Sequence, residues 1–503
     1  MVELPTFADL NVFAALPMIM LAVGGALLLV ADRFIKNKFY TATYALVGVL
    51  VSLVLALIQA GEVFDIGDPG LAFMDMFVAD KFTYVVNVVV LTAAAIGILA
   101  SYDYLERTNL DRGEYYILLI YTAVGAMLMG SSSNLVMIFI ALELLSIPLY
   151  VLSGIRRPAE ESEESAMKYF LLGAFSSAFF VYGIGLIFGA TGTMDLRAVW
   201  EAANTITAED ATAEFLLLMG SGMLLVGLGF KVAAVPFHMW TPDVYQGAPT
   251  PVTAYMSVVA KVGGFAALLR VMITGLSVSL EGGNTALWLD TVQVVAVATL
   301  VLGNFVAIVQ TDLKRLLAYS SIAHAGYILI AVASGAVQGF GDAAAEAALI
   351  YMVAYTFTNI GAFAVVIALE NDDMSGTKMS DIKGLANRYP WHAMAMAVFM
   401  FSLTGVPLTA GFIGKFFVFK AALDADLTLL AVIGVLTSVV SAFYYVRVIV
   451  YMYFEPEENE ITVDRKPMLN SALAITTVGT FVLGVLPFIV ADLVQGATIA
   501  LVP

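Results

Sequence analysis

Apolar residues in this chain are gathered into long, nearly uninterrupted stretches that short polar segments separate. A helix that crosses a lipid bilayer needs about 20 consecutive, mostly apolar residues. About fourteen stretches reach that length, so we expect an all-α polytopic membrane protein with about fourteen transmembrane helices. The stretches lie near residues 11–31, 39–60, 82–101, 115–131, 134–154, 166–190, 213–237, 249–273, 286–309, 314–335, 344–369, 391–420, 427–452 and 469–495.

The composition supports the bilayer as the solvent of this chain. Of its 503 residues, 61% are hydrophobic and 13% are charged, whereas soluble domains average roughly 45–50% apolar and about 25% charged. The net charge of −17 argues against a nucleic-acid partner. Without cysteine the chain has no thiolate ligand for zinc or an iron–sulfur cluster, and three histidines are too few for a His-rich haem or copper centre. Any electron transfer in which the protein takes part is therefore expected on other chains.

The basic residues predict the orientation in the membrane, because lysine and arginine favour cytoplasmic loops. The loops after the first, third, fifth, ninth, eleventh and thirteenth stretches hold fifteen of them, and the alternate loops hold three. We therefore expect both termini on the outer side. Arg270 and Arg447 lie near helix ends and are expected to reach the interface. The fifteen are Arg33, Lys36, Lys38, Arg107, Arg112, Arg156, Arg157, Lys168, Lys314, Arg315, Lys378, Lys383, Arg388, Arg465 and Lys466, and the three are Lys81, Arg197 and Lys420.

Four charged residues fall in the middle of apolar stretches: Glu143, Lys231, Lys261 and Lys415. A charge at the centre of the bilayer costs about 2.5–3.5 kcal/mol on insertion scales. A structural ion pair or a snorkelling side chain is the alternative for any one lysine, and a satisfied structural acid is the alternative for Glu143, but together the four charges predict a hydrated ion path. Because a nearby carboxylate favours the charged form of a lysine, Glu143 is a candidate to modulate proton binding at Lys231.

Two of the lysine-bearing stretches contain a helix breaker. Pro236 follows Lys231 by five residues, and Pro407 precedes Lys415 by eight. Proline kinks are common in membrane helices, but the opposite order of lysine and proline suggests two inverted five-helix repeats, stretches 4–8 and 9–13, with broken seventh and twelfth helices. This architecture is typical of a transporter-like ion path. The expected units are residues 1–112, 113–275, 284–453 and 466–503.

Three further residues are candidates for proton relay. His238 follows the first break, and His324 shares its stretch with Ser320, Ser321 and Tyr327. A packing role is the alternative for either histidine. Lys168 follows a run of glutamates, so a solvated surface charge is its alternative. The chain has no P-loop, nucleophile elbow or HExxH motif, and we expect neither a bound metal nor a soluble-enzyme active site.

Three segments resemble the antiporter-like membrane subunits of respiratory complex I, most closely those of the subunit N type. They are GFKVAAVPFHMWTPDVYQGAPTPVTAYMSVVAKVGGFAALLR, LKRLLAYSSIAHAGYILI and SLTGVPLTAGFIGKFFVFKAAL. The resemblance implies a proton-translocating subunit of an NADH:quinone oxidoreductase, driven by quinone reduction elsewhere in that complex. It makes Glu143–Lys231 the modulating pair, Lys261 the central relay and Lys415 the exit-side group. His238 and His324 would lie on the polar axis between them, and Lys168 matches a lysine typical of subunit N.

The same resemblance implies the surroundings of the chain. NADH, FMN, iron–sulfur clusters and quinone would be used by the parent complex, with no cofactor on this chain. The expected partners are other membrane-arm subunits, namely the neighbouring antiporter-like subunit and the small subunit K, in a bacterial cytoplasmic membrane. Two alternatives stay open: a subunit of an Mrp-type cation/proton antiporter, which shares the fold and the lysines, and a passive scaffold, which the four mid-membrane charges make less attractive.

Overall fold

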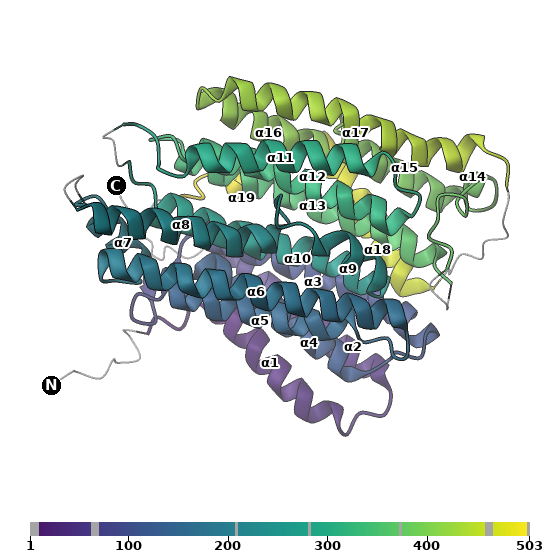
Figure 1. The fold of residues 1–503 in the computed structure, drawn as a ribbon. Helices are drawn as coiled ribbons and strands as arrows, with labels where there is room; N and C mark the ends of the chain where they lie inside the picture. Colours follow the sequence, from purple (N-terminus) through teal and green to yellow (C-terminus); the bar gives the residue numbers. More distant parts are fainter. Residues whose placement is uncertain are drawn as a thin grey trace.

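The computed structural model describes residues 10–61, 70–206, 210–279, 283–371, 375–457 and 466–499, and it is a bundle of long helices lying side by side (Figure 1). One of the predicted inner-loop residues, Arg465, lies outside these residues. The helices are α1 Leu16–Asp32, α2 Lys38–Ala60, α3 Lys81–Arg107, α4 Gly113–Ser131, α5 Leu135–Ser153, α6 Glu160–Thr191, α7 Leu196–Ala203, α8 Ala211–Val232, α9 Trp240–Gly247, α10 Thr250–Leu269, the π-helix η1 Arg270–Gly275, α11 Leu289–Ala307, α12 Leu313–Ser334, α13 Gly341–Leu369, α14 Leu385–Arg388, α15 Pro390–Thr404, α16 Ala410–Asp424, α17 Thr428–Phe454, α18 Pro467–Val485 and α19 Phe488–Val494.

The all-α prediction is confirmed, since every one of the fourteen apolar stretches is helical. Among the residues that the structure describes, twelve helices are long and apolar enough to cross a membrane. The two remaining stretches are α1, which has 17 residues, and residues 391–420, which are divided between α15 and α16. The structure adds a short antiparallel hairpin that the apolar pattern did not predict, with β1 (Gly70–Ala72) paired to β2 (Phe77–Ala79).

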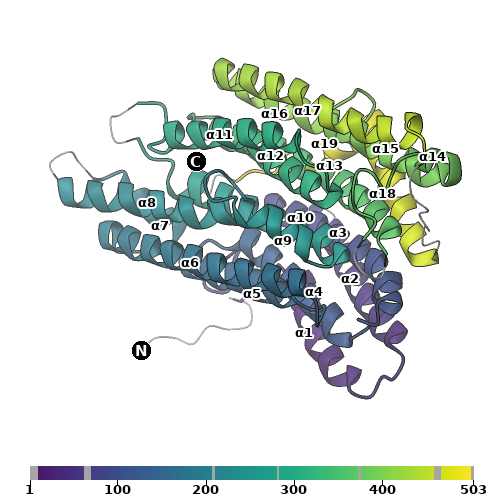
Figure 2. The same ribbon diagram turned by 45° about the vertical axis from the view of Figure 1, so that its right-hand side comes forward.

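Four helices form the centre of the bundle. In α3, α12 and α13 about nine-tenths of the apolar segment is buried, and in α10 all of it is. In α2, α6 and α17 the buried share is only 33–39%, so these peripheral helices turn apolar faces outward. Because lipid replaces water around such faces, the bundle buries its small and polar residues inside and leaves leucine, valine and phenylalanine outside. Two views of the ribbon show α10 and α3 enclosed by the other helices (Figures 1 and 2).

Both predicted helix breaks are present. The first separates α8 from α9 around Pro236, and the second separates α15 from α16 around Pro407. Proline lacks the N–H that would continue the helix, and its ring clashes with the preceding turn. Each break therefore leaves main-chain carbonyls without their normal helical partner in the interior of the bundle. The boundaries of the two inverted repeats stay a prediction.

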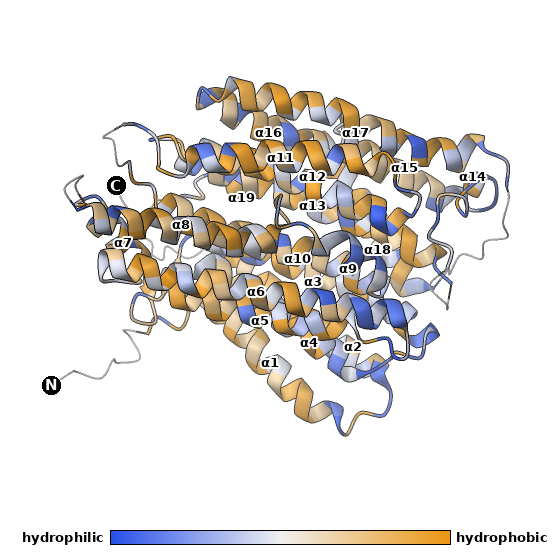
Figure 3. Ribbon diagram, viewed as in Figure 1, coloured by the Kyte–Doolittle hydropathy of each residue, from blue (hydrophilic) through white to orange (hydrophobic). Residues whose placement is uncertain are grey.

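The two ends of the bundle differ in polarity. Hydrophilic residues gather at the end that carries α9 and α14, as Figure 3 shows. Here the end of α3 is tied to the end of α13 by a hydrogen bond from Arg107 to the Glu370 carbonyl, and to the start of α18 by an ion pair between Lys466 and Glu106. We call this the basic end, because it carries the loops in which the fifteen lysines and arginines were counted.

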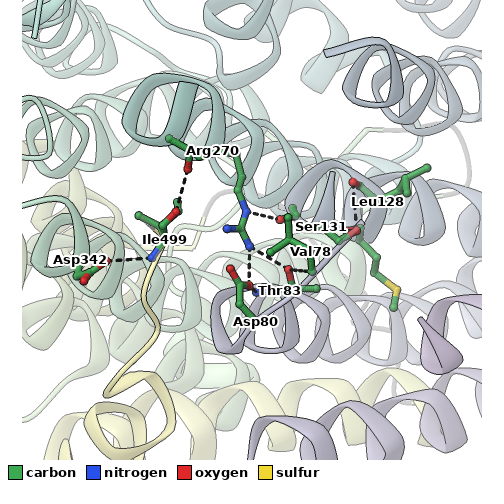
Figure 4. Close-up of polar contacts among 11 residues, drawn as sticks. Val78, Asp80, Thr83, Leu128, Ser131, Arg270, Asp342 and Ile499 are labelled. Atoms are coloured by element: carbon green, nitrogen blue, oxygen red, sulfur yellow. Dashed lines mark hydrogen bonds and ion pairs between the residues drawn. The ribbon is translucent and has the colours of Figure 1, made fainter. Parts of the chain in front are cut away.

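The prediction for Arg270 is wrong, since its side chain is fully buried at the opposite end of the bundle. Its guanidinium forms an ion pair with Asp80 and donates to the Thr83 hydroxyl and the Gly130 carbonyl, both at 3.0 Å (Figure 4). These partners satisfy the charge inside the protein, so the side chain does not need to reach the interface. Arg447 instead donates to the carbonyls of Ile308 and Gln310 just beyond α11.

The same close-up shows how the C-terminal segment is fixed. The main-chain carbonyl of Ile499 accepts from the Thr274 hydroxyl at 2.8 Å, and its N–H donates to Asp342 at 3.0 Å (Figure 4). Thr274 belongs to η1 and Asp342 to the first turn of α13. The segment after α19 therefore joins the ends of two central helices.

Candidate functional site: a buried lysine and histidine axis

The three mid-membrane lysines are all buried, with 2–5% of each residue exposed. They lie on three different helices: Lys231 on α8, Lys261 on α10 and Lys415 on α16. Since an unpaired ammonium group in this setting is costly, the hydrogen-bond partners of each lysine decide what it can do.

Lys231 is held by hydroxyl groups. Its Nζ donates to Ser146 on α5 at 2.8 Å and to Tyr169 on α6 at 3.3 Å. The Tyr169 ring stacks on Trp240, with centroids 4.5 Å apart, and Trp240 donates to the Phe230 carbonyl near the end of α8. Hydroxyls accept a hydrogen bond from an ammonium group and also pair with a neutral amine, so this pocket tolerates both forms of the lysine.

The predicted partner Glu143 lies within electrostatic range of Lys231 but not in direct contact with it. The two residues form no ion pair in the described part of the chain, and Glu143 accepts from the Ser177 hydroxyl on α6 instead. Glu143 is one helical turn before Ser146, which does contact Lys231. Ser146 is therefore the residue of α5 that contacts Lys231, and Glu143 lies one helical turn before it on the same helix.

Lys261 binds the carbonyl that the first break sets free. Its Nζ donates to the main-chain oxygen of Val232, the last residue of α8, at 2.8 Å. In an unbroken helix this oxygen would accept from the N–H four residues later, which is the position of Pro236. Because Pro236 has no N–H, the Val232 carbonyl stays available as the hydrogen-bond acceptor of Lys261 on the neighbouring helix.

Lys415 repeats this arrangement at the second break. Its Nζ donates to the carbonyls of Leu403 at 2.9 Å and Thr404 at 2.8 Å, and to the Ser438 hydroxyl on α17 at 2.8 Å. Pro407 lies four residues after Leu403, so here too the proline removes the competing N–H. The carbonyls end α15, where the helix dipole is negative and favours a cation.

His324 is within electrostatic range of both Lys261 and Lys415. Its ring is buried in α12, and its two nitrogens hydrogen-bond with the hydroxyls of Tyr351 at 2.6 Å and Tyr445 at 3.1 Å. A cavity of about 10 Å³, close to the size of one water molecule, is lined by His324 and by Leu403, whose carbonyl binds Lys415. The ring thus has partners on both nitrogens, the arrangement that a proton relay needs.

The other two relay candidates are not brought into this axis. His238 lies half-buried in the first break, and in the described part of the chain neither Lys231 nor Lys261 donates a hydrogen bond to it. Lys168 lies in the first third of α6 near the basic end and forms ion pairs with Glu164 at 2.6 Å and Asp243 at 2.7 Å. Arg315 binds the other oxygen of Asp243 at 2.8 Å, so Lys168 belongs to a partly exposed network that joins α6, α9 and α12.

Sequence reasoning did not single out the tyrosines that hold the axis together. Tyr169, Tyr351 and Tyr445 touch Lys231 or His324, but tyrosine is frequent in apolar helices and carries no formal charge that would make it conspicuous. Their spacing relative to the lysines and to His324 is not visible in one dimension. Among the described residues there is no group of three or more His, Cys, Asp or Glu that could hold a metal ion.

Comparison with known proteins places the chain. The sequence profile of the family described as NADH:quinone oxidoreductase/Mrp antiporter, TM, matches residues 132–441, and the NADH-quinone oxidoreductase subunit N of Trichlorobacter lovleyi is 42% identical over 98% of both chains. The chain belongs to the family of NADH-quinone oxidoreductase subunit N. A structure of respiratory complex I from Thermus thermophilus contains a chain of this fold, with a TM-score of 0.77, 33% identity, and coverage of 96% of our chain and 99% of that one.

The fold extends beyond the subunit N family. A chain in the structure of an Mrp complex from Dietzia superposes with a TM-score of 0.80, covering 97% of each chain, at 21% identity. That likeness shows a common fold and nothing about activity. The sequence relationship to subunit N therefore outweighs the Mrp alternative.

Proposed function

We propose that this chain is a proton-translocating membrane-arm subunit of a bacterial NADH:quinone oxidoreductase, the role implied by the names of its relatives. The observation that carries the proposal is the series of buried, hydrogen-bonded lysines with His324 within electrostatic range of two of them. The parent complex supplies NADH oxidation, FMN, iron–sulfur clusters and quinone reduction, and this chain supplies proton-carrying side chains.

Each residue has a separate task in this proposal. Glu143 changes the electrostatic environment of Lys231, which loads a proton among the hydroxyls of Ser146 and Tyr169. Lys261 is the central relay, because its contact with the α8 carbonyl couples it to the helix that bears Lys231.

The exit side of the axis is His324 and Lys415. His324 passes the proton through its tyrosine partners toward Lys415, whose Nζ donates to the carbonyls that end α15. His238 and Lys168 are assigned supporting positions in the break and at the basic end rather than steps in the buried chain.

The orientation and neighbours follow from the same assignment. The basic end faces the cytoplasm, because lysine and arginine are concentrated there, and both termini face the periplasm. The neighbouring antiporter-like subunit and the small subunit K are the proposed contacts of this chain within the membrane arm.

A native gel decides between this assignment and the Mrp-type alternative. Membranes are extracted in mild detergent, separated, stained for NADH dehydrogenase activity and probed for this chain. We expect the chain to migrate with a large NADH-oxidising band. Migration in a smaller assembly without that activity would assign it to a cation/proton antiporter.

The central relay is tested by replacing Lys261 with methionine, which keeps the length and volume of the side chain but removes its proton. We expect NADH-driven acidification of inverted membrane vesicles to fall by about two orders of magnitude, as for loss of a proton-transfer group, while the NADH-stained band persists. Normal acidification with a normally assembled complex would exclude the proposed path and favour a scaffold.

A further inference from the structure

A fourth buried lysine lies at the basic end, outside the axis described above. Lys314 was counted with the loop residues, but it is the second residue of α12 and only 2% exposed. Its Nζ donates to the main-chain oxygen of Ala248, in the turn between α9 and α10, at 2.8 Å. The charged groups that act on it electrostatically are Glu370, Asp312 and Arg156.

Glu370 is the acid in this cluster that has a free oxygen. It caps the end of α13 and is 1% exposed, with one carboxylate oxygen 3.4 Å from the Tyr104 hydroxyl and the other buried without a hydrogen-bond partner among the described residues. The carboxylate oxygens of Asp312, by contrast, accept hydrogen bonds from a main-chain N–H and a threonine hydroxyl. Of the two acids that act electrostatically on Lys314, Glu370 is therefore the one with an oxygen available to accept a proton.

The remaining cations of the cluster are arginines, which do not release protons. Arg107 donates to the main-chain oxygen of Glu370 at 2.8 Å, and its guanidinium lies 5.4 Å from the centre of the Tyr104 ring. Arg156 is within electrostatic range of both Lys314 and Tyr104. Neither arginine can carry the proton, so Glu370 and Lys314 are the groups of this cluster that can exchange one.

A stripe of buried polar side chains leads from this cluster toward the central relay. Thr250 is two residues from Ala248, the residue that Lys314 contacts. Side chains three or four positions apart lie on one face of a helix, and such a series continues along the first half of α10. The stripe consists of Thr250, Thr253, Ser257 and Lys261, each at most 3% exposed.

A second stripe begins at the same lysine on α12. Ser321 follows Lys314 by seven residues, two helical turns, and His324 follows three residues later. Ser321 accepts from the Tyr355 hydroxyl at 2.8 Å. Thus α10, which bears Lys261, and α12, which bears His324, both carry polar side chains in the half nearer the basic end.

Toward the opposite end the same helices are apolar. Residues 262–269 of α10 read VGGFAALL, and residues 328–333 of α12 read ILIAVA. No side chain in either segment carries nitrogen or oxygen, and both segments are buried. Protons therefore have polar partners between the basic end and Lys261, whereas these two segments offer none. Beyond His324 the only polar side chains of α12 are Tyr327 and Ser334.

We propose that Lys314 and Glu370 form a proton-uptake site that supplies Lys261 from the basic end. A proton that enters at the basic end binds the buried oxygen of Glu370 that has no hydrogen-bond partner among the described residues, and then passes to the neutral amine of Lys314, which restores the carboxylate. The lysine then releases it along the hydroxyls of α10 to Lys261. This assignment rests on the proton translocation proposed above.

The test separates proton transfer from a purely structural clamp. Lys314→Arg keeps a cation that can donate to Ala248 but cannot release a proton, and Glu370→Gln keeps the shape of the side chain but cannot take one up. Both are made in the whole complex, with Glu370→Asp as the conservative variant. Lys378→Arg is the matched control, because Lys378 is an exposed lysine at the same end. NADH-driven acidification of inverted vesicles is measured together with the NADH-stained native gel.

We expect Lys314→Arg and Glu370→Gln to lower acidification by about tenfold or more, whereas Glu370→Asp and Lys378→Arg stay within about twofold of the original protein. Control-level acidification by Lys314→Arg would show that the lysine only clamps the turn, and would overturn the proposal. If Lys314→Arg does not assemble, Glu370→Gln decides alone. Lys261→Met is measured in parallel. Normal acidification by Lys261→Met would refute the proton path itself. Loss of acidification in Lys261→Met, together with normal acidification in Lys314→Arg, would refute only the uptake site.

Discussion

The two broken helices differ in which lysine occupies the carbonyl that the proline leaves free. At the first break the Val232 carbonyl is bound by Lys261, which belongs to the neighbouring helix α10. At the second break the Leu403 carbonyl is bound by Lys415, which belongs to the other half of the same interrupted helix. The freed carbonyl therefore links two neighbouring helices at the first break, whereas at the second break it links the two halves of one interrupted helix.

This difference has a mechanical consequence. A displacement of α8 changes the hydrogen bonding of Lys261 directly and moves Lys231 with it, because both depend on the last turn of that helix. Lys415 keeps its two carbonyl acceptors unless α15 and α16 move relative to each other. The first break is suited to transmitting a change between two proton carriers, and the second to holding one cation firmly.

The largest difference in heat resistance is expected between Lys415→Met and Lys231→Met. Both should abolish NADH-driven acidification, but Lys415→Met also leaves the buried carbonyl of Leu403 without its donor, at a cost of about 1–3 kcal/mol. Lys231→Met should cost less stability, because the Ser146 hydroxyl that Lys231 contacts keeps its own hydrogen bond to the Leu142 carbonyl. The measurement is the fraction of NADH-stained complex that survives a heating series.

Lys420→Met is the control for this pair, since Lys420 lies on the same helix as Lys415 in an exposed ion pair with Asp424. It should change neither acidification nor heat resistance. Equal heat sensitivity of Lys415→Met and Lys231→Met would contradict the distinction between the two breaks.

An intermediate effect is expected from Gly405→Ala at the second break. Gly405 has φ +93°, and a Cβ there would lie 2.9 Å from the Cδ of Lys415. The left-handed backbone alone costs about 1–2 kcal/mol for a residue with a side chain. We expect a lower midpoint in the same heating series and a partial loss of acidification.

Gly222→Ala in α8 is the matched substitution in the first broken helix, where nothing lies within 4 Å of the added carbon. Alanine favours a helix over glycine, so this variant should be as heat-resistant as the original protein or slightly more so. A loss of stability at Gly222 as large as at Gly405 would show that the second break is not specially constrained.

The smallest effect is expected from Lys168→Met. The lysine is partly exposed, and Arg315 still neutralises Asp243 when it is removed, so the change in stability should stay below about 1 kcal/mol. Acidification should remain within about twofold of the original rate. A loss as large as that of Lys231→Met would place Lys168 in the proton path and extend the first half of the axis to the basic end.

The sequence was sufficient to predict the fold because a bilayer imposes strict rules. Each apolar stretch must be a helix, and the prolines at 236 and 407 must interrupt theirs. The buried lysines were equally visible, since a charge inside an apolar stretch is expensive wherever it points. Lys314 escaped notice because it stands at the start of its helix, where the same residue type is normally solvated.

The contacts of these lysines were not predictable. Lys261 and Lys415 bind main-chain carbonyls, which every residue possesses and no side-chain pattern identifies. Arg270 was expected at the membrane interface because its partner Asp80 is distant in sequence and precedes another helix. Such pairings arise from the way the helices assemble, and a periodicity along one stretch does not contain that information.

The ion pair between Asp80 and Arg270 also constrains the order in which the chain is built into its membrane. The two residues are 190 positions apart, so at 5–20 residues per second about 10–40 s of synthesis separate them. During that interval the Asp80 carboxylate has no Arg270 to pair with. The contact that this ion pair makes between α3 and the end of α10 therefore forms only after α10 has been synthesised.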